Sequence, residues 1–183
     1  MELTKYLKQY EASVADHLVH YLTAREMLGG TLLTTDDFYD VWDKIAPSYI
    51  SDSVKEIAQY PNVALGWAMY LGMAVAMFWD DEWNIYSRIP NLYEYIRDKR
   101  GYDYMDEVVR TDILSLDEKD FDRFEQLVQD CAGQVLSRIR HEQIEPQSPT
   151  AFHVYASSVK VLFHLGASVV LYRLGYKLEA QPR

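Results

Sequence analysis

The sequence predicts an all-α protein: a single-domain helical bundle with three or four long helices and several short connecting helices around a central apolar helix at about residues 62–86. Residues 63–79 contain no charge and no side-chain amide, and their apolar side chains cover every face of a helix. Elsewhere, apolar residues recur every three or four positions, as they do on one helix face. No segment shows the convincing alternation of a half-buried strand.

The first third of the chain is expected to hold one long helix and two short ones. Residues 2–28 carry a single apolar stripe, and the glycine pair that follows suits a helix end. The polar run 34–37 provides an N-cap and first-turn acids for a short helix that Pro47 ends at residue 46. Ser51 or Ser53 is expected to cap a second short helix running to about residue 60.

The central helix is expected to start at Pro61, because proline is tolerated in a first helical turn. Within it, Ala64, Ala68, Gly72 and Ala76 lie four residues apart. Small residues along one ridge allow a second helix to approach closely. The sequence therefore predicts that another helix crosses the central one at this ridge.

The sequence of the second half of the chain predicts four further helices. Asn91 caps a short helix closed by Gly101, and residues 102–114 form another. Ser115–Glu118 has the form of a capping box before a helix with a clean apolar stripe over residues 121–139. After a linker at 145–149, Ser148 or Thr150 caps a last long helix to about residue 177. The tail 178–183 is expected to be frayed, and residues 1–183 form one domain.

Charge and composition disfavour several classes of function. The chain has 183 residues, a net charge of −10 and no dense basic face, so nucleic acid and anionic membrane surfaces are disfavoured as partners. The strictly apolar run is shorter than the roughly 20 residues that span a bilayer, so a membrane location is disfavoured. With a single cysteine, Cys131, and a charged N-terminus, the sequence predicts a soluble, cytoplasmic protein.

An acidic cluster follows the apolar helix at Asp80, Asp81 and Glu82. Together with Asn84, the run DDEWN resembles the aspartate-rich Mg²⁺ motif of helical terpene synthases over five residues. It has Asn84 in place of the final acid, and no second metal motif is present. Because hard cations bind converging carboxylates, the three acids are candidate metal ligands. The alternative is a solvated helix end, which is the usual role of a charge run.

The last long helix carries a polar stripe formed by His153, Ser157, Lys160, His164 and Ser168. We expect this stripe to be the solvent face of an otherwise apolar helix. The two histidines lie three turns apart, about 16 Å along the axis, so they do not share one metal ion.

Eleven tyrosine, tryptophan and phenylalanine rings fall between residues 60 and 104, interleaved with acids. Aromatic faces beside carboxylates suit organic cations, and tyrosine and tryptophan also anchor protein interfaces. The same rings could instead pack the end of the bundle. The candidate ligand-binding or partner-binding residues are Trp67, Tyr70, Trp79, Trp83, Tyr86 and Tyr93.

Two functions from different classes remain open. The first is a non-enzymatic interaction module that binds a protein partner, or a second copy of itself as a homodimer, through the aromatic surface. The alternative is a helical-bundle enzyme for a small ligand or a divalent metal, with the acidic cluster at the mouth of an aromatic pocket. No nucleophile motif or phosphate loop is present, so the sequence favours the first and predicts no cofactor.

Overall fold

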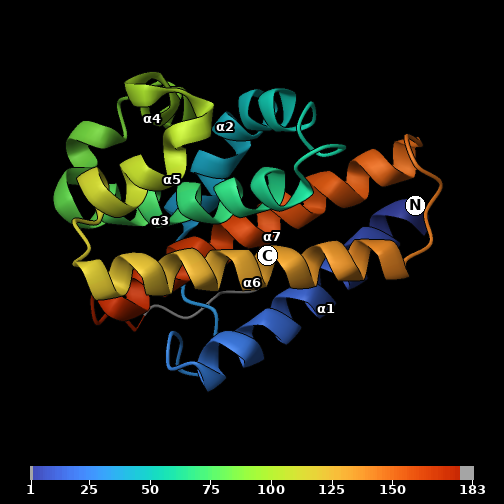
Figure 1. Cartoon of the computed structure of the whole chain (residues 1–183), viewed down its shortest axis with the longest axis horizontal. Coiled ribbons are helices and arrows are strands. Elements are labelled where there is room, and N and C mark those ends of the chain that lie inside the picture. Colours follow the sequence, from blue (N-terminus) through green and yellow to red (C-terminus); the bar gives the residue numbers. More distant parts are fainter. Residues whose placement is uncertain (1, 178–183) are drawn as a thin grey trace.

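The computed structural model describes residues 2–177, so the predicted frayed tail lies outside the described residues. The all-α prediction is confirmed (Figure 1). The elements are α1 (Glu2–Ala24), α2 (Asp36–Ser53), α3 (Pro61–Tyr86), α4 (Leu92–Arg100), a 3₁₀ turn (Tyr102–Tyr104), α5 (Met105–Glu107), a π-helical segment (Val108–Ile113), α6 (Glu118–His141) and α7 (Pro149–Arg173).

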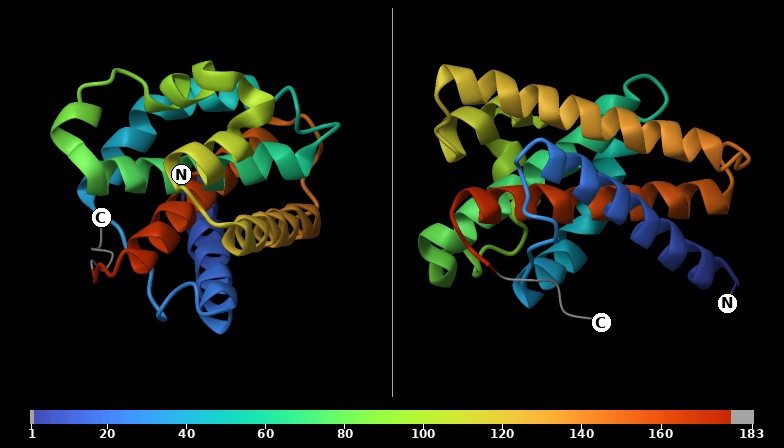
Figure 2. Two further views of the ribbon diagram at one scale, coloured as in Figure 1. Left: turned by 60° about the vertical axis from the view of Figure 1, so that its left-hand side comes forward. Right: turned by 90° about the horizontal axis from the view of Figure 1, so that it is seen from below.

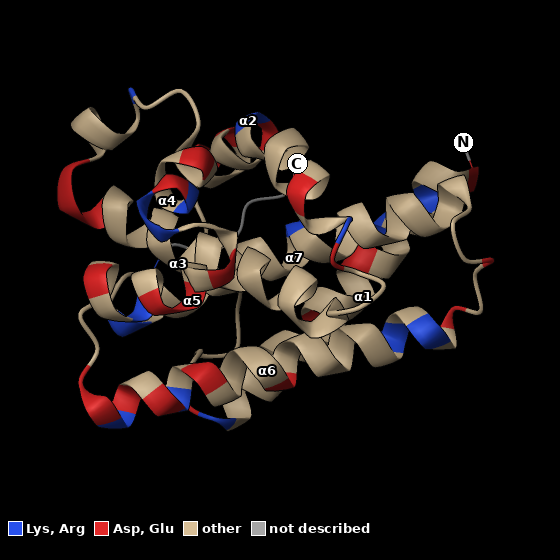
Figure 3. Ribbon diagram, turned by 45° about the horizontal axis from the view of Figure 1, so that its top comes forward, with Lys and Arg blue, Asp and Glu red and all other residues tan. Residues whose placement is uncertain are grey.

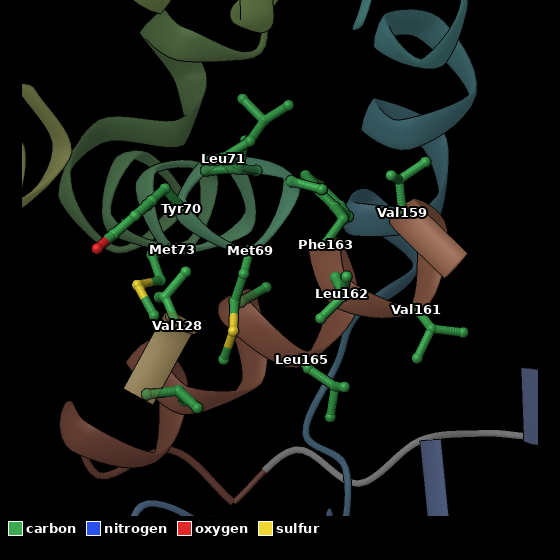
Figure 4. Packing of buried hydrophobic residues seen from close by; sticks show 14 of the residues in the cluster. Met69, Tyr70, Leu71, Met73, Val128, Val159, Val161, Leu162, Phe163 and Leu165 are labelled. Atoms are coloured by element: carbon green, nitrogen blue, oxygen red, sulfur yellow. The ribbon is translucent and has the colours of Figure 1, made fainter. Parts of the chain in front are cut away.

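Helices α3 and α7 form the centre of the fold, and their residues are buried on nearly every side. They cross where Gly72 of α3 and Gly166 of α7 let the two backbones touch. Around this crossing, Met69 and Met73 of α3 lie near Phe163 and Leu165 of α7 (Figure 4). The predicted close approach at the ridge of small residues is therefore observed, and α7 is the helix that approaches.

The remaining long helices cover this central pair (Figure 2). Helix α6 packs on α3, where Val128 fills the space beside Gly66. Helix α1 packs on α7, and the hydroxyls of Tyr10 and Ser158 share a buried hydrogen bond of 2.6 Å. Helices α2 and α4 pack against each other on another side of α3. The architecture is thus a bundle in which two apolar helices are enclosed by amphipathic ones.

Helix α2 differs from the prediction, because it continues through Pro47 to Ser53 as one long helix. Ile45, Tyr49 and Ser53 lie buried along one face on both sides of the proline, and Pro47 itself is exposed. A proline on the solvent side allows the helix to bend without losing the packing of its buried face. The predicted helix from Ser51 or Ser53 to residue 60 does not form, and residues 54–59 are turns.

Helix ends agree with the sequence where a local cap decides them. The Asn91 side chain accepts a hydrogen bond from the Glu94 N–H, and Gly101 closes α4 with φ +92°. Ser148 caps α7 in the same way. The prediction of a capping box at Ser115 is wrong. Asp117 is the N-cap of α6, and its side chain accepts a hydrogen bond from the Asp120 N–H. Aspartate caps a helix as well as serine, and Asp117 lies closer to the buried stripe.

Residues 102–114 are predicted as one short helix, but the segment 102–113 changes geometry twice, from 3₁₀ through α to π. The Leu114 N–H bonds to the Val109 carbonyl at 2.8 Å, which is the spacing of a π turn. This widening accompanies three consecutive buried side chains, Val108, Val109 and Arg110.

Three of the five residues in the polar stripe of α7 do not face solvent as predicted, whereas His153 is exposed and Lys160 is partly exposed. Ser157, His164 and Ser168 are buried, with at most 7% of each residue exposed. Ser157 donates to Glu11 of α1, and Ser168 accepts a bond from the Leu33 N–H at 2.7 Å. Burying a hydroxyl is costly unless it forms a hydrogen bond, and these partners on α1 and the following loop provide one. The prediction failed because the partners are about 135 to 146 residues away in the chain.

Two helices in the described chain, α3 and α7, are long and apolar enough to cross a membrane by length and composition. Their most apolar windows are 72% and 89% buried inside the protein. Since these are the two helices at the centre of the bundle, packing alone accounts for their apolar character. The soluble, cytoplasmic location stays a prediction.

Candidate functional site

Helix α3 is broken near its end, and this break shapes the candidate site. Glu82 has φ −143° and ψ 78°, outside helical geometry, so the last turn leaves the axis of the helix (Figure 3). In a straight helix Phe78 and Tyr86 would be about 12 Å apart along the axis. Here their rings stack at 4.2 Å, with an angle of 10° between the planes. The break therefore turns residues 83–86 back against the body of the protein.

The returning turn and α2 enclose a cleft of about 120 Å³, which we call the α2–α3 cleft. Its walls combine two aromatic rings, two carboxylates and one lysine with aliphatic side chains. The lining residues are Asp37, Asp40, Val41, Lys44, Trp83, Tyr86, Ser87, Ile89, Pro90 and Leu92.

One carboxylate of the cleft is held in place by a tryptophan. The Trp79 indole N–H donates to the Asp37 carboxylate at 2.9 Å, and the Trp79 ring packs edge-on against Phe38. The Asp40 carboxylate, by contrast, forms no ion pair with any residue in the described part of the chain. The cleft thus presents two negative charges, one fixed and one unpaired, and the positive charge of Lys44 beside Trp83 and Tyr86, so its lining carries a net charge of −1.

The structure gathers three of the six aromatic candidates at this cleft. Trp83 and Tyr86 line it, and Trp79 lies behind Asp37. Tyr93 is fully buried elsewhere: its hydroxyl donates to Asp52 at 2.5 Å. Burial, reinforced by that carboxylate, raises the pKa of Tyr93 above its usual range. Its role is therefore in the core.

Trp67 and Tyr70 lie in a different place, beside α6. They border a hollow of about 220 Å³ together with Asp106 and Glu125. The Trp67 indole N–H donates to the Tyr102 carbonyl at 2.7 Å, and only 1% of Tyr70 is exposed. The predicted aromatic belt is therefore divided between core, this hollow and the α2–α3 cleft.

The acidic cluster Asp80, Asp81 and Glu82 is exposed at the break. Asp80 accepts a hydrogen bond of 2.7 Å from the Tyr176 hydroxyl. Residues 2–177 contain no group of three His, Cys, Asp or Glu side chains placed to hold a metal ion. Since hard cations need several converging oxygens, the geometry of the described residues provides no observation in favour of the metal-ligand prediction.

No family model, curated protein or solved structure matches this chain. The resemblance of DDEWN to terpene synthases therefore stays at five residues.

Asp37 and Asp40 were missed as site residues, because Asp37 was interpreted only as a first-turn acid of a helix and Asp40 was not singled out. Their spacing of three residues places both on one helix face, and this signal is present in the sequence. Their position opposite Trp83 could not be predicted. It depends on the break at Glu82 and on packing between segments about 40 residues apart.

Proposed function

We propose that this protein is a non-enzymatic interaction module, and that its α2–α3 cleft receives a lysine or arginine side chain from a basic segment of a partner protein. The observation that carries the proposal is the shared position of Asp37, Asp40, Trp83 and Tyr86 around one small cleft. Carboxylates neutralise a cationic group, and aromatic faces attract it within about 6 Å of the ring centre.

The volume of the cleft favours a side chain over a small substrate. Small-molecule sites usually enclose about 300–1,000 Å³, whereas this cleft encloses about 120 Å³. A hollow of this size suits one long side chain that enters from outside. The rest of the partner would then lie on the surface around the cleft.

The rim supports contact with a partner. Ile85 is 57% exposed and Tyr95 is 38% exposed, and both adjoin the turn that forms the cleft. Exposed aromatic and aliphatic side chains beside a pocket are typical of interface centres. The acids at Asp81 and Glu82 and the net charge of −10 would attract a basic partner over a longer range.

The charge distribution favours a different protein over a second copy of this chain. In a symmetric homodimer through this surface, Asp40 and the exposed acids of one copy would approach those of the other. Juxtaposed like charges cost free energy in an interface. Self-association stays a prediction, and the molecular mass in solution tests it directly. A monomer that binds a basic peptide in the cleft supports the proposal. A dimer that buries the cleft contradicts it.

The first test uses a short peptide of alternating lysine and glycine as the probe, with a glutamate–glycine peptide as its counterpart. We expect the lysine peptide to bind and the glutamate peptide not to bind, measured by isothermal titration calorimetry with the full chain. Asp40→Asn should weaken binding by about tenfold, because it removes one charge-assisted hydrogen bond. Trp83→Ala should weaken it by a similar factor.

The matched control is Asp122→Asn, which makes the same charge change at an exposed position of α6. It should leave the affinity within about twofold, because exposed charges far from the site are screened. If Asp40→Asn and Asp122→Asn weaken binding equally, the net charge of the protein explains the affinity and the cleft has no specific role.

A further inference from the structure

A second pocket lies on another side of the molecule, between α1, α2 and α7. It encloses about 280 Å³, and we call it the α1–α7 pocket. Its walls include part of the α7 polar stripe that the sequence assigned to solvent. The lining residues are Lys8, Glu11, Ala12, Ala15, Leu32, Tyr39, Lys160, Val161, His164 and Leu165.

The charged end of this pocket holds two ammonium groups and one carboxylate. Both oxygens of Glu11 are already engaged: Lys160 lies 3.2 Å from one, and the Ser157 hydroxyl donates to the other at 2.8 Å. Lys8 forms no ion pair with any residue between 2 and 177. The pocket therefore keeps one positive charge without a partner, in a chain whose net charge is −10.

The other end of the pocket is apolar. Ala12 and Ala15 leave room because their side chains are small, and aliphatic side chains of α7 form the floor. The rings of Tyr39 and His164 lie 4.4 Å apart at an angle of 37° and contribute an aromatic wall. An apolar cavity with a few polar groups at one end is the usual form of a small-molecule site.

We propose that the α1–α7 pocket binds a small organic carboxylate. The Lys8 ammonium holds the carboxylate group, and the apolar body of the ligand lies over Ala12 and Ala15 against the Tyr39–His164 wall. The unpaired lysine disfavours an organic cation, and the apolar floor disfavours inorganic phosphate. The volume lies just below the usual range of about 300–1,000 Å³ for small-molecule sites, so the ligand is a compact one.

The experiment uses the full chain with hexanoate as the probe, neutral hexanamide of the same shape, and inorganic phosphate. Hexanoate at millimolar concentration should raise the midpoint of thermal unfolding by several degrees in a saturable way. Hexanamide and phosphate should leave it unchanged. Calorimetry on the same solutions gives the dissociation constant.

Two variants test the two ends of the pocket. Lys8→Gln should weaken hexanoate binding about tenfold by removing the ammonium, while the control Lys55→Gln, at an exposed position after α2, should not. Ala12→Leu should fill the apolar end and weaken binding at least as much, with the circular dichroism spectrum unchanged. Equal shifts with phosphate or hexanamide, no shift with hexanoate, or unaltered binding in Lys8→Gln and Ala12→Leu would each overturn the proposal. None of these outcomes bears on the α2–α3 cleft.

Discussion

Gly72 of α3 and Gly166 of α7 face each other at a crossing so close that neither position has room for a methyl group. A Cβ atom on Gly72 would lie 1.8 Å from the carbonyl oxygen of Phe163, and one on Gly166 would lie 2.0 Å from the carbonyl oxygen of Met69. Both clashes are with backbone, which cannot rotate away as a side chain can. The contact of the two helix backbones therefore depends on these two glycines.

Gly72→Ala is expected to destabilise the protein by about 3 kcal/mol or more, because the added methyl group forces α3 and α7 apart. Urea unfolding followed by circular dichroism measures this loss. Gly133 provides the matched control, since a Cβ atom there meets nothing within 4 Å. Gly133→Ala should stabilise α6 by up to about 1 kcal/mol. If both variants shifted the midpoint in the same direction, the crossing would not be as tight as described.

Arg110→Ala is expected to lower the free energy of unfolding by about 3 kcal/mol. The guanidinium is 3% exposed and lies 3.1 Å from Asp106 and 3.0 Å from Glu125, over the Phe121 ring. Its removal leaves the partly buried Asp106 carboxylate without its cation. Arg100→Ala is the comparison, because the Arg100–Glu107 pair is about half exposed and should contribute less than about 1 kcal/mol. Similar losses in urea unfolding for the two variants would contradict the prediction.

Alkaline pH should destabilise the fold through its buried tyrosines. Burial raises the pKa of six of them above the usual value of about 10: Tyr10, Tyr49, Tyr70, Tyr93, Tyr102 and Tyr155. Above pH 10 the unfolded chain therefore loses protons that the folded chain retains. The contribution of these tyrosines to the free energy of unfolding is thus complete below pH 10, and it decreases as the pH rises further.

The measurement is the urea midpoint from pH 8 to 11, together with tyrosinate absorbance. We expect most of the absorbance change to coincide with loss of helical circular dichroism. Complete tyrosine ionisation in a protein that stays helical would show that these hydroxyls are accessible to solvent.

Cys131 should be unreactive in the folded protein. Burial raises the pKa of its thiol to about 12, so at pH 8 only about one molecule in ten thousand carries the reactive thiolate. Ellman's reagent should therefore label the folded chain very slowly and label it at once in urea. Fast labelling without denaturant would mean that this part of α6 opens readily.

Divalent metals should leave stability unchanged. Asp80 is hydrogen-bonded to Tyr176 rather than to other acids, and a hard cation needs several converging oxygens. Thermal unfolding with EDTA, Mg²⁺, Mn²⁺ and Zn²⁺ should give one midpoint. A rise with one metal that disappears in Asp80→Asn would restore the metal-dependent enzyme as the leading function.

The sequence predicted best where a local signal decides the structure. Pro61 begins α3, Asn91 and Gly101 bound α4, and Ser148 begins α7, because each cap depends on residues within one helical turn. Pro47 was misleading for the opposite reason. Packing of the face around Ile45 outweighed the local tendency of proline to end a helix.

The candidate site was only half accessible from sequence. Trp83 and Tyr86 were identified from their composition and from the acids near them, but Asp37 joins them through a contact between distant segments. The same limit applies to the α7 stripe. His164 and Ser168 follow the spacing of a solvent face, and only the position of α1 and α2 shows that they are enclosed.

The break at Glu82 separates the residues of α3 that pack in the core from the residues that would face a partner. In a single straight helix the two sets would be joined. Residues before it are constrained by contact with α7, where even one added methyl group is excluded. Trp83, Asn84 and Ile85 follow it and are at least partly exposed, so substitutions there would alter recognition with little effect on folding. Descendants of this chain could therefore acquire new partners by changing three residues, while the sequence of the central helix pair stayed fixed.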